Sequence, residues 1–259
     1  MDTTLAQSRR MSAPRAIALC QCFNGALEFQ AGNWDQAEKA LHESIELYRE
    51  IGAASGEALA CQRLGVLQTA RGQLEEAWVT LEEGEVVAER AVMRAHCLTR
   101  IYAAMARNRL EAGDLEAADD ALASGLAMSE RHGHCATCNA LLLPVAVSVR
   151  LAQQDLAAAE SFCQQLDQAA EEYASRTWLA MAQQAKGEVA AAGGDVAQAL
   201  ACYQNAYEMF TAANYEYEAA HCLANLASLY QRRNRQDDKT KAQAAKSKAR
   251  QIFQQLETI

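Results

Sequence analysis

The sequence of 259 residues has only two prolines, Pro14 and Pro144, and aromatic residues make up just 6% of it. Its apolar runs all fall short of the roughly 20 residues that a membrane-spanning helix needs. Long β-rich segments are also scarce, whereas alanine, the residue with the highest helix propensity, is abundant. The composition therefore predicts an all-α protein that does not span a membrane.

The motifs of common catalytic sites are missing as well. The sequence has no phosphate-binding loop of the form GxxxxGK[ST], no HExxH and no nucleophile elbow. Its many glutamates follow the spacing of solvated helix faces. We therefore expect no enzymatic activity and no resident cofactor, with zinc as the one alternative considered below.

The amino-terminal residues do not read as a secretory signal, because the apolar stretch at residues 16–20 is too short and no small-residue cleavage site follows it. The nine cysteines are an odd number and are scattered through helical patterns. In a reducing compartment they are expected to be core thiols or metal ligands rather than disulfides. We predict a cytoplasmic protein.

Charge is distributed unevenly along the chain. The net charge is −9, which disfavours nucleic acid as a partner of the whole protein. Residues 231–250 hold eight of the 24 basic and two of the 33 acidic residues, so this segment carries +6 and the rest −15. The segment is either a patch for nucleic acid or an acidic partner, or the solvated outer face of a last helix.

A repeat of 40–41 residues organises most of the chain. Each repeat has one residue at a turn, which we call its anchor. The anchor is the first residue of a run such as "GNWDQAEKAL", and an alanine follows five residues after it. The anchors are Gly32, Gly72, Gly113, Gln154 and Gly194, and the alanines are Ala37, Ala77, Ala118, Ala159 and Ala199. The residues seven positions before the anchors are Gly25, Gly65, Ala106, Val147 and Gly187.

This pattern predicts a helical hairpin in each repeat. A turn glycine can adopt the left-handed conformation that ends a first helix. The Asn or Asp that follows four of the anchors (Asn33, Asp114, Asp155, Asp195) can cap the second helix. A sixth, more polar unit begins near Tyr215 and lacks the turn glycine, as expected of a terminal cap.

The pattern resembles the tetratricopeptide repeat (TPR), most clearly in Gly25–Gly32–Ala37–Leu41, Gly65–Gly72–Ala77–Leu81 and Gly187–Gly194–Ala199–Tyr203. The period exceeds the usual ~34 residues and the closing proline is missing, which is similar to the helical-repeat regions of bacterial regulators of the MalT and LuxR type. The resemblance implies a right-handed α-α superhelix of about six hairpins. We expect a flexible segment at residues 1–15 and a single TPR-like domain at 16–257, with units near 17–52, 53–92, 93–132, 135–173, 174–213 and 215–257.

In repeats of this kind the first helix of each hairpin lines a concave groove suited to a protein or peptide partner. Counting from the anchors places these candidate partner-binding residues in the groove: Phe29, Gln62, Thr69, Arg100, Arg107, Ser148, Gln184 and Glu188. The same count places Leu19 of the first unit in the groove. The paired lysines that TPR domains use to bind a chaperone's carboxylate are absent, since Lys186 is the only lysine in a central first helix.

The segment "RHGHCATC" at residues 131–138 could be a metal site or the capped start of a buried helix. Cys97 and Cys138 share a repeat register, so Cys97, Cys135 and Cys138 could bind zinc with one of His96, His132 or His134, of which we select His134. A second CxxC motif, which would strengthen the assignment, is missing. Cysteines also fill tight helix contacts as small apolar residues.

Three hypotheses follow. The first is a protein- or peptide-binding scaffold, the sensing or docking arm of a bacterial regulatory or signalling system, for instance in transcription regulation. The second is a thiol-based zinc or redox sensor that uses Cys97, Cys135 and Cys138. The third is a small-molecule effector site inside the superhelix, for which Phe29, Tyr102 and Trp178 are the aromatic candidates.

Overall fold

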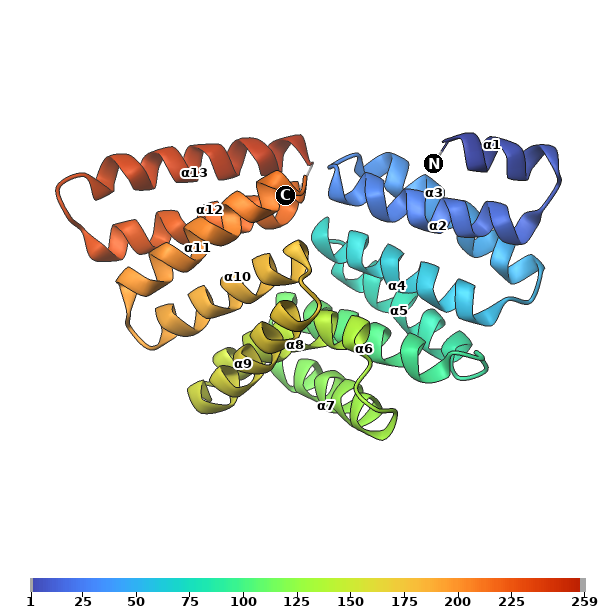
Figure 1. The fold of residues 1–259 in the computed structure, drawn as a ribbon, viewed down its shortest axis with the longest axis horizontal. Coiled ribbons are helices and arrows are strands. Elements are labelled where there is room, and N and C mark those ends of the chain that lie inside the picture. Colours follow the sequence, from blue (N-terminus) through green and yellow to red (C-terminus); the bar gives the residue numbers. More distant parts are fainter. Residues whose placement is uncertain (1, 257–259) are drawn as a thin grey trace. The chain divides into compact units, whose positions relative to one another are not determined.

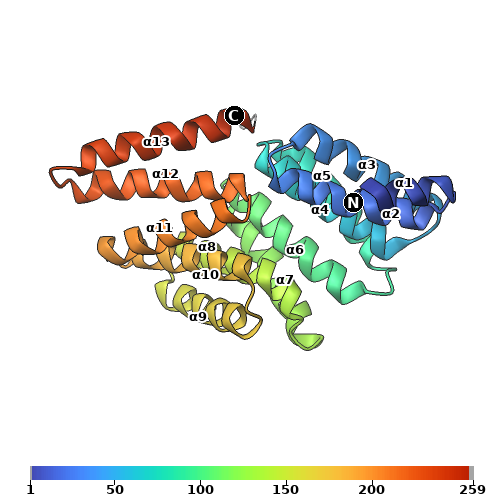
Figure 2. The same ribbon diagram turned by 45° about the horizontal axis from the view of Figure 1, so that its top comes forward.

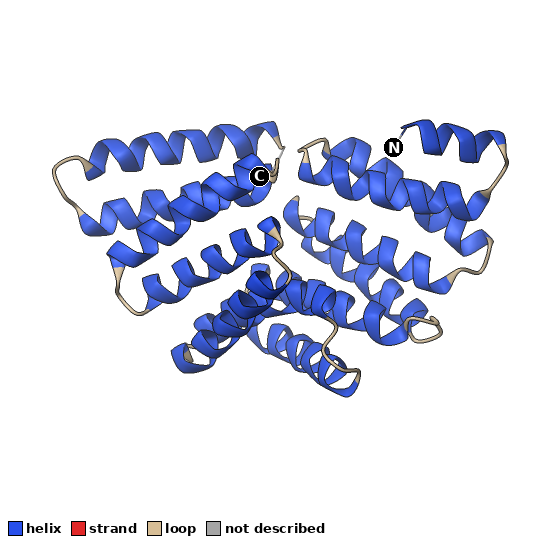
Figure 3. Ribbon diagram, in the orientation of Figure 1, coloured by secondary structure: helices blue, strands red, loops and turns tan. Residues whose placement is uncertain are grey.

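The structure is a computed structural model that describes residues 2–256. Within that range the chain forms thirteen helices and no strand, so the predicted all-α class is confirmed (Figure 3). None of these helices is both long enough and apolar enough to cross a membrane. The contacts group the chain into two compact units, Met1–Cys138 (unit 1) and Asn139–Ile259 (unit 2), where sequence analysis expected one domain at 16–257.

Unit 1 is a stack of helical hairpins (Figures 1 and 2). Helix α2 pairs with α3, α4 with α5 and α6 with α7, while the first helices α2, α4 and α6 also contact one another in sequence order. The bounds are α1 (Asp2–Arg10), α2 (Pro14–Gln30), α3 (Trp34–Glu50), α4 (Ala54–Ala70), α5 (Leu74–Ala88), α6 (Arg94–Glu111) and α7 (Leu115–Arg131). Each of the helices α2, α4 and α6 has one side that faces away from its hairpin partner. We call the surface formed by these sides the first-helix face of unit 1.

Unit 2 repeats the pattern, and the division between the units falls inside α8. Helix α9 contacts α10, α10 pairs with α11, and α12 pairs with α13 (Figure 1). The bounds are α8 (Ala136–Ala152), α9 (Leu156–Glu172), α10 (Arg176–Ala192), α11 (Val196–Ala212), α12 (Glu216–Arg233) and α13 (Asp238–Gln255). Phe210, Tyr203 and Leu226 belong to a buried cluster formed by its last four helices.

The local rules read from the repeat explain these hairpins. The four anchor glycines adopt positive φ angles of 77–85°, and Gln154 adopts the same left-handed conformation at 63° without being glycine. All five repeat alanines are completely buried. Asp114, Asp155 and Asp195 each accept a hydrogen bond from the backbone three residues ahead, as predicted of helix caps.

Two local expectations differ from the structure. Asn33 occupies the N-cap position of α3, but its side chain accepts no capping hydrogen bond, and its amide nitrogen donates to the Glu28 carboxylate at 2.8 Å. The expected flexible segment at residues 1–15 contains helix α1, which packs against α2. Arg9 anchors α1 through an ion pair with Glu43 of α3 at 2.9 Å, and two arginines in its last turn suit the negative end of the helix dipole.

Candidate functional site

The partner-binding residues expected in unit 1 differ in how accessible they are. Arg100 and Arg107 are half-buried, and Arg107 pairs with Glu111 at 2.9 Å. The hydroxyl of Thr69 donates to the Gly65 carbonyl and accepts from Asn108, so it joins α4 to α6. Gln62 is only 5% exposed, which corrects its placement in the groove: α4 turns this side chain into the packing between helices.

Phe29 packs against Trp34 of the adjoining helix, with ring centroids 5.6 Å apart. The other two aromatic residues considered for an effector site also have partners nearby. The Tyr102 hydroxyl donates to Glu85 at 2.8 Å, and Trp178 lies against Tyr173 with centroids 5.4 Å apart. These contacts explain the three aromatic side chains as supports of local packing.

The three residues expected in unit 2 lie together on neighbouring first helices. Ser148 of α8 donates to the Glu188 carboxylate of α10 at 3.0 Å, and Gln184 donates to the other oxygen of that carboxylate at 3.4 Å. Ser148 and Glu188 were both chosen by counting from the repeat anchors. They are 40 residues apart in sequence and are in contact in the structure. Both of these donors to the Glu188 carboxylate are neutral side chains.

An apolar stripe on the first-helix face of unit 1 was only partly predicted. Leu19, Phe23 and Leu27 of α2 are each about half exposed and lie four residues apart, so they share one side of the helix. Sequence analysis placed Leu19 in the groove and missed the other two. The signal was the i, i+4, i+8 spacing of large apolar residues in the first repeat.

One arginine adjoins this stripe, and a second lies on the next first helix. The guanidinium of Arg63 in α4 stacks over the Phe23 ring at 4.7 Å and donates to the Cys22 carbonyl at 2.8 Å. Burial and the positive charge of Arg63 both lower the pKa of Arg100, whose guanidinium donates to the Thr137 carbonyl at 3.5 Å. Among the described residues, neither arginine has a carboxylate partner.

The basic segment at residues 231–250 lies at the end of α12 and on α13. Arg233 binds Asp238, and Lys248 donates to the hydroxyl of Tyr207. Most of the remaining basic side chains are exposed. This arrangement matches the solvated outer face of a last helix.

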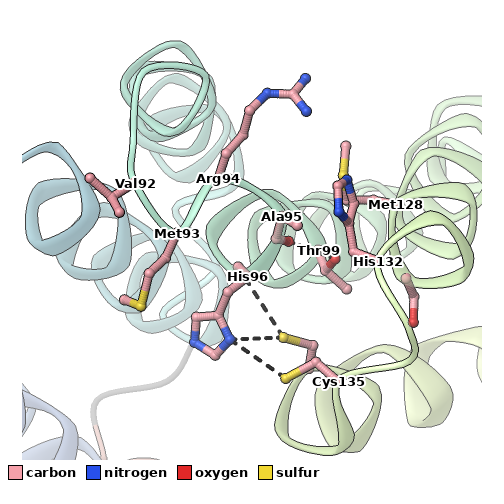
Figure 4. A pocket seen from close by; sticks show the side chains of 11 residues that line it. Val92, Met93, Arg94, Ala95, His96, Thr99, Met128, His132 and Cys135 are labelled. Atoms are coloured by element: carbon pink, nitrogen blue, oxygen red, sulfur yellow. Dashed lines mark hydrogen bonds between the residues drawn. The ribbon is translucent and has the colours of Figure 1, made fainter.

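The thiol site of unit 1 contains His96, Cys135 and Cys138, whose possible ligand atoms all lie within 4.8 Å of one another. Figure 4 shows the His96 ring turned toward the two sulfurs. Its Nδ1 lies 3.1 Å from the Cys138 Sγ and 3.7 Å from the Cys135 Sγ. Cys138 is buried, whereas Cys135 is the only exposed thiol among the nine.

This grouping corrects two members of the metal set expected from the sequence. Cys97 is fully buried and its sulfur faces the Ser55 carbonyl at 3.7 Å, away from the other two thiols. His134 is exposed and occupies a left-handed turn position with φ of 53°, outside the group of ligand atoms. His96, the alternative considered from the sequence, supplies the imidazole instead.

The three thiols differ in acidity because their surroundings differ. Burial raises the pKa of Cys97 to about 11. Burial also raises the pKa of Cys138, to about 12, with a further contribution from the neighbouring Cys135. Partial burial works against ionisation of Cys135 as well, but hydrogen bonds with Thr137, His96 and Cys138 outweigh it and lower that pKa to about 6.

The comparison with solved structures agrees with the helical-repeat fold predicted from the sequence. One solved structure, BtubC (BKLC) from P. vanneervenii, is 17% identical and superposes with a TM-score of 0.55 over 90% of this chain and 93% of that one. At this identity the likeness concerns the fold alone. No curated protein sequence matches the chain.

The family comparison covers nearly the whole sequence. The model of the MalT-like TPR region matches residues 10–258. This confirms the resemblance drawn from the repeat anchors, and with it the TPR-like helical-repeat fold. The chain therefore belongs to the MalT-like TPR region family.

Proposed function

We propose that the protein is a scaffold that recognises an acidic, partly apolar peptide segment on the first-helix face of unit 1. One observation carries this proposal: Arg63, which has no carboxylate partner among the described residues, lies over the Phe23 ring in the half-exposed stripe of Leu19, Phe23 and Leu27. The family membership supports a role as the docking or sensing arm of a bacterial regulatory or signalling system.

The chemistry of this face favours such a partner. Apolar residues spaced over two helical turns can pack against the apolar side of an amphipathic helix. Guanidinium groups form strong, charge-assisted hydrogen bonds with carboxylates. The function we infer is recognition without chemistry on the ligand.

The test starts from an unbiased peptide selection. Peptides displayed at random would be selected on the purified full chain, and the affinity of the selected peptides measured by fluorescence anisotropy at low and high salt. We expect selection of acidic sequences with apolar residues at helical spacing. Their affinity should fall with increasing salt, because exposed charges are screened.

Three variants locate the binding surface. Phe23→Ser should weaken binding about tenfold or more, as removal of an aromatic anchor does. Arg63→Gln should weaken it less and reduce its salt dependence. Val86→Ser is the matched control, because Val86 is a 70% exposed apolar residue of α5, the second helix of its hairpin. The proposal fails if no peptide is selected, or if the control weakens binding as much as Phe23→Ser while all variants keep the wild-type circular dichroism.

A further inference from the structure

We propose that His96, Cys135 and Cys138 bind a zinc ion, with the imidazole Nδ1 and two thiolates as protein ligands and a fourth position open to solvent. The site lies entirely within unit 1. Arg100 of the first-helix face donates to the Thr137 carbonyl beside this site at 3.5 Å, but the zinc proposal does not depend on peptide binding.

The distances between the candidate ligands suit tetrahedral zinc. Zinc bonds of about 2.3 Å to sulfur and 2.0–2.1 Å to nitrogen imply a separation of about 3.6 Å between sulfur and nitrogen ligands and about 3.8 Å between two sulfurs. The observed sulfur–nitrogen distances are 3.1 and 3.7 Å, and no pair of ligand atoms is more than 4.8 Å apart. Small side-chain rotations therefore suffice to place a metal between them.

The backbone brings the three side chains together from two separate segments. His96 is the third residue of α6. After α7 the chain passes through two consecutive left-handed residues, Gly133 and His134, which place Cys135 immediately before α8. Cys138 follows in the first turn of α8, so both sulfurs reach the same imidazole (Figure 4).

Packing alone does not account for this arrangement. Seven of the nine cysteines are buried, and Cys20 is half-buried, as expected of small apolar residues in helix contacts. Cys135 is exposed, yet its sulfur lies against the His96 nitrogen and the Thr137 hydroxyl. An exposed thiol that converges with a buried thiol and an imidazole is the ligand combination typical of zinc sites.

The residues that line the surrounding cavity determine which kind of cation can bind. It has a volume of about 440 Å³, and its lining contains the three ligands, His132 and the thioethers Met93 and Met128. It contains no Asp or Glu, so it lacks the carboxylate oxygens that Mg²⁺ and Ca²⁺ require. Two thiolates and an imidazole instead favour a borderline or soft ion such as Zn²⁺.

The cavity also leaves room for a fourth ligand. A zinc ion held by three protein ligands keeps an open position that water or another donor can occupy. Zinc binds cysteine as the thiolate, so binding displaces into the solvent the protons that the two thiols still carry. Proton release therefore reports on binding independently of any variant.

The experiment uses the full chain, reduced, metal-free and under anaerobic conditions. Titration with Co²⁺ should produce sulfur-to-cobalt charge-transfer absorption and the visible bands of a tetrahedral ion, saturating at an equimolar amount. Zn²⁺ added to the cobalt-loaded wild-type protein should remove these bands, and Zn²⁺ added to the metal-free protein should release protons and protect Cys135 from alkylation. Cys135→Ser, Cys138→Ser and His96→Ala should each lower the affinity more than about 100-fold, since even residues that only support a ligand contribute about 10- to 100-fold.

Two controls address the residues that the structure leaves outside the site. Cys97→Ser removes a buried thiol of the same repeat register, and His134→Asn keeps a residue that tolerates the left-handed turn. Both should keep the cobalt spectrum. The proposal is overturned if folded, reduced wild-type protein shows no charge-transfer band and no zinc protection of Cys135, or if the band persists in both Cys135→Ser and Cys138→Ser.

Discussion

Leu41 of α3 occupies the space beside Gly25 of α2 so closely that a Cβ atom at residue 25 would lie 2.6 Å from the Leu41 Cγ. The same relationship recurs one repeat later between Gly65 and Leu81, again at 2.6 Å. In the fifth repeat Tyr203 fills the space beside Gly187 at 3.0 Å. The small residue in the first helix and the large residue 16 positions later thus determine how closely the two helices of these hairpins pack against each other.

Gly65→Ala should therefore destabilise the protein, although alanine favours a helix more than glycine does by about 1 kcal/mol. Leu81 is fully buried and cannot move aside, and overpacking of this kind typically costs about 1–3 kcal/mol. We expect a lower midpoint of urea unfolding followed by circular dichroism. Gly193→Ala is the matched control, because its Cβ would meet no atom closer than 3.4 Å and should leave the midpoint almost unchanged. An unchanged midpoint for Gly65→Ala would show that the hairpin can open to admit the methyl group.

The hairpins could be predicted from the sequence because the rules that build them are local. A left-handed turn, a capping Asp and a small residue opposite a large one each involve residues that are close in the chain. Gln154 shows how strongly the repeat imposes the turn: it adopts φ of 63° although it is not glycine. The anchor positions alone were therefore enough to place the helix pairs.

The exposure of single side chains could not be predicted in the same way, because it depends on neighbouring repeats. Gln62 was expected in the groove and is 5% exposed, whereas Phe23, which was not considered, is 48% exposed. The thiol site shows the same limit. Cys97 shares the repeat register of Cys138, but successive residues of a helix point about 100° apart, so it is His96 that reaches Cys138.

Asn108 offers a test of the polar contacts between repeats. It is completely buried, and its amide nitrogen donates to the Thr69 hydroxyl at 3.1 Å and to the Leu74 carbonyl at 3.0 Å. Asn108→Ala should lower the free energy of unfolding by about 1–3 kcal/mol, because it leaves buried polar atoms without a partner. Asn205→Ala, at an exposed position of α11, should be neutral or slightly stabilising. Equal midpoints for the two variants in urea unfolding would contradict this role of Asn108.

Thiol exposure leads to a prediction about alkylation of the metal-free protein. Cys135 should react first with iodoacetamide, because it is the only exposed thiol, and half-buried Cys20 should follow. The seven buried cysteines should react only after unfolding in urea. Mass spectrometry of tryptic peptides after timed quenching gives the order directly. Rapid labelling of Cys97 in the folded protein would be inconsistent with its complete burial.

The turn of the last hairpin lacks glycine, and Asp238 stabilises it instead. Its carboxylate accepts from Arg233 at 2.6 and 2.9 Å and from the Arg235 backbone at 2.9 Å, while Asn234 takes the left-handed position with φ of 50°. These hydrogen bonds, above all those from the Arg233 side chain, hold the pKa of Asp238 well below its usual value. The folded state therefore binds the proton more weakly than the unfolded state does. The resulting stabilisation is fully present above the unfolded pKa of about 3.9 and is lost as the pH falls below it.

Asp238→Asn should accordingly speed amide hydrogen exchange across α13 at pH 7, and the difference from wild type should shrink as the pH approaches 3. The neighbouring Asp237→Asn is the control, because Asp237 makes no side-chain hydrogen bond as the cap of α13 and should leave exchange unchanged at both pH values. Each variant removes one negative charge, and the two positions are adjacent. Only loss of the hydrogen-bonded carboxylate should therefore produce a pH-dependent difference. If Asp238→Asn exchanges like wild type at pH 7, the carboxylate does not hold the last hairpin closed.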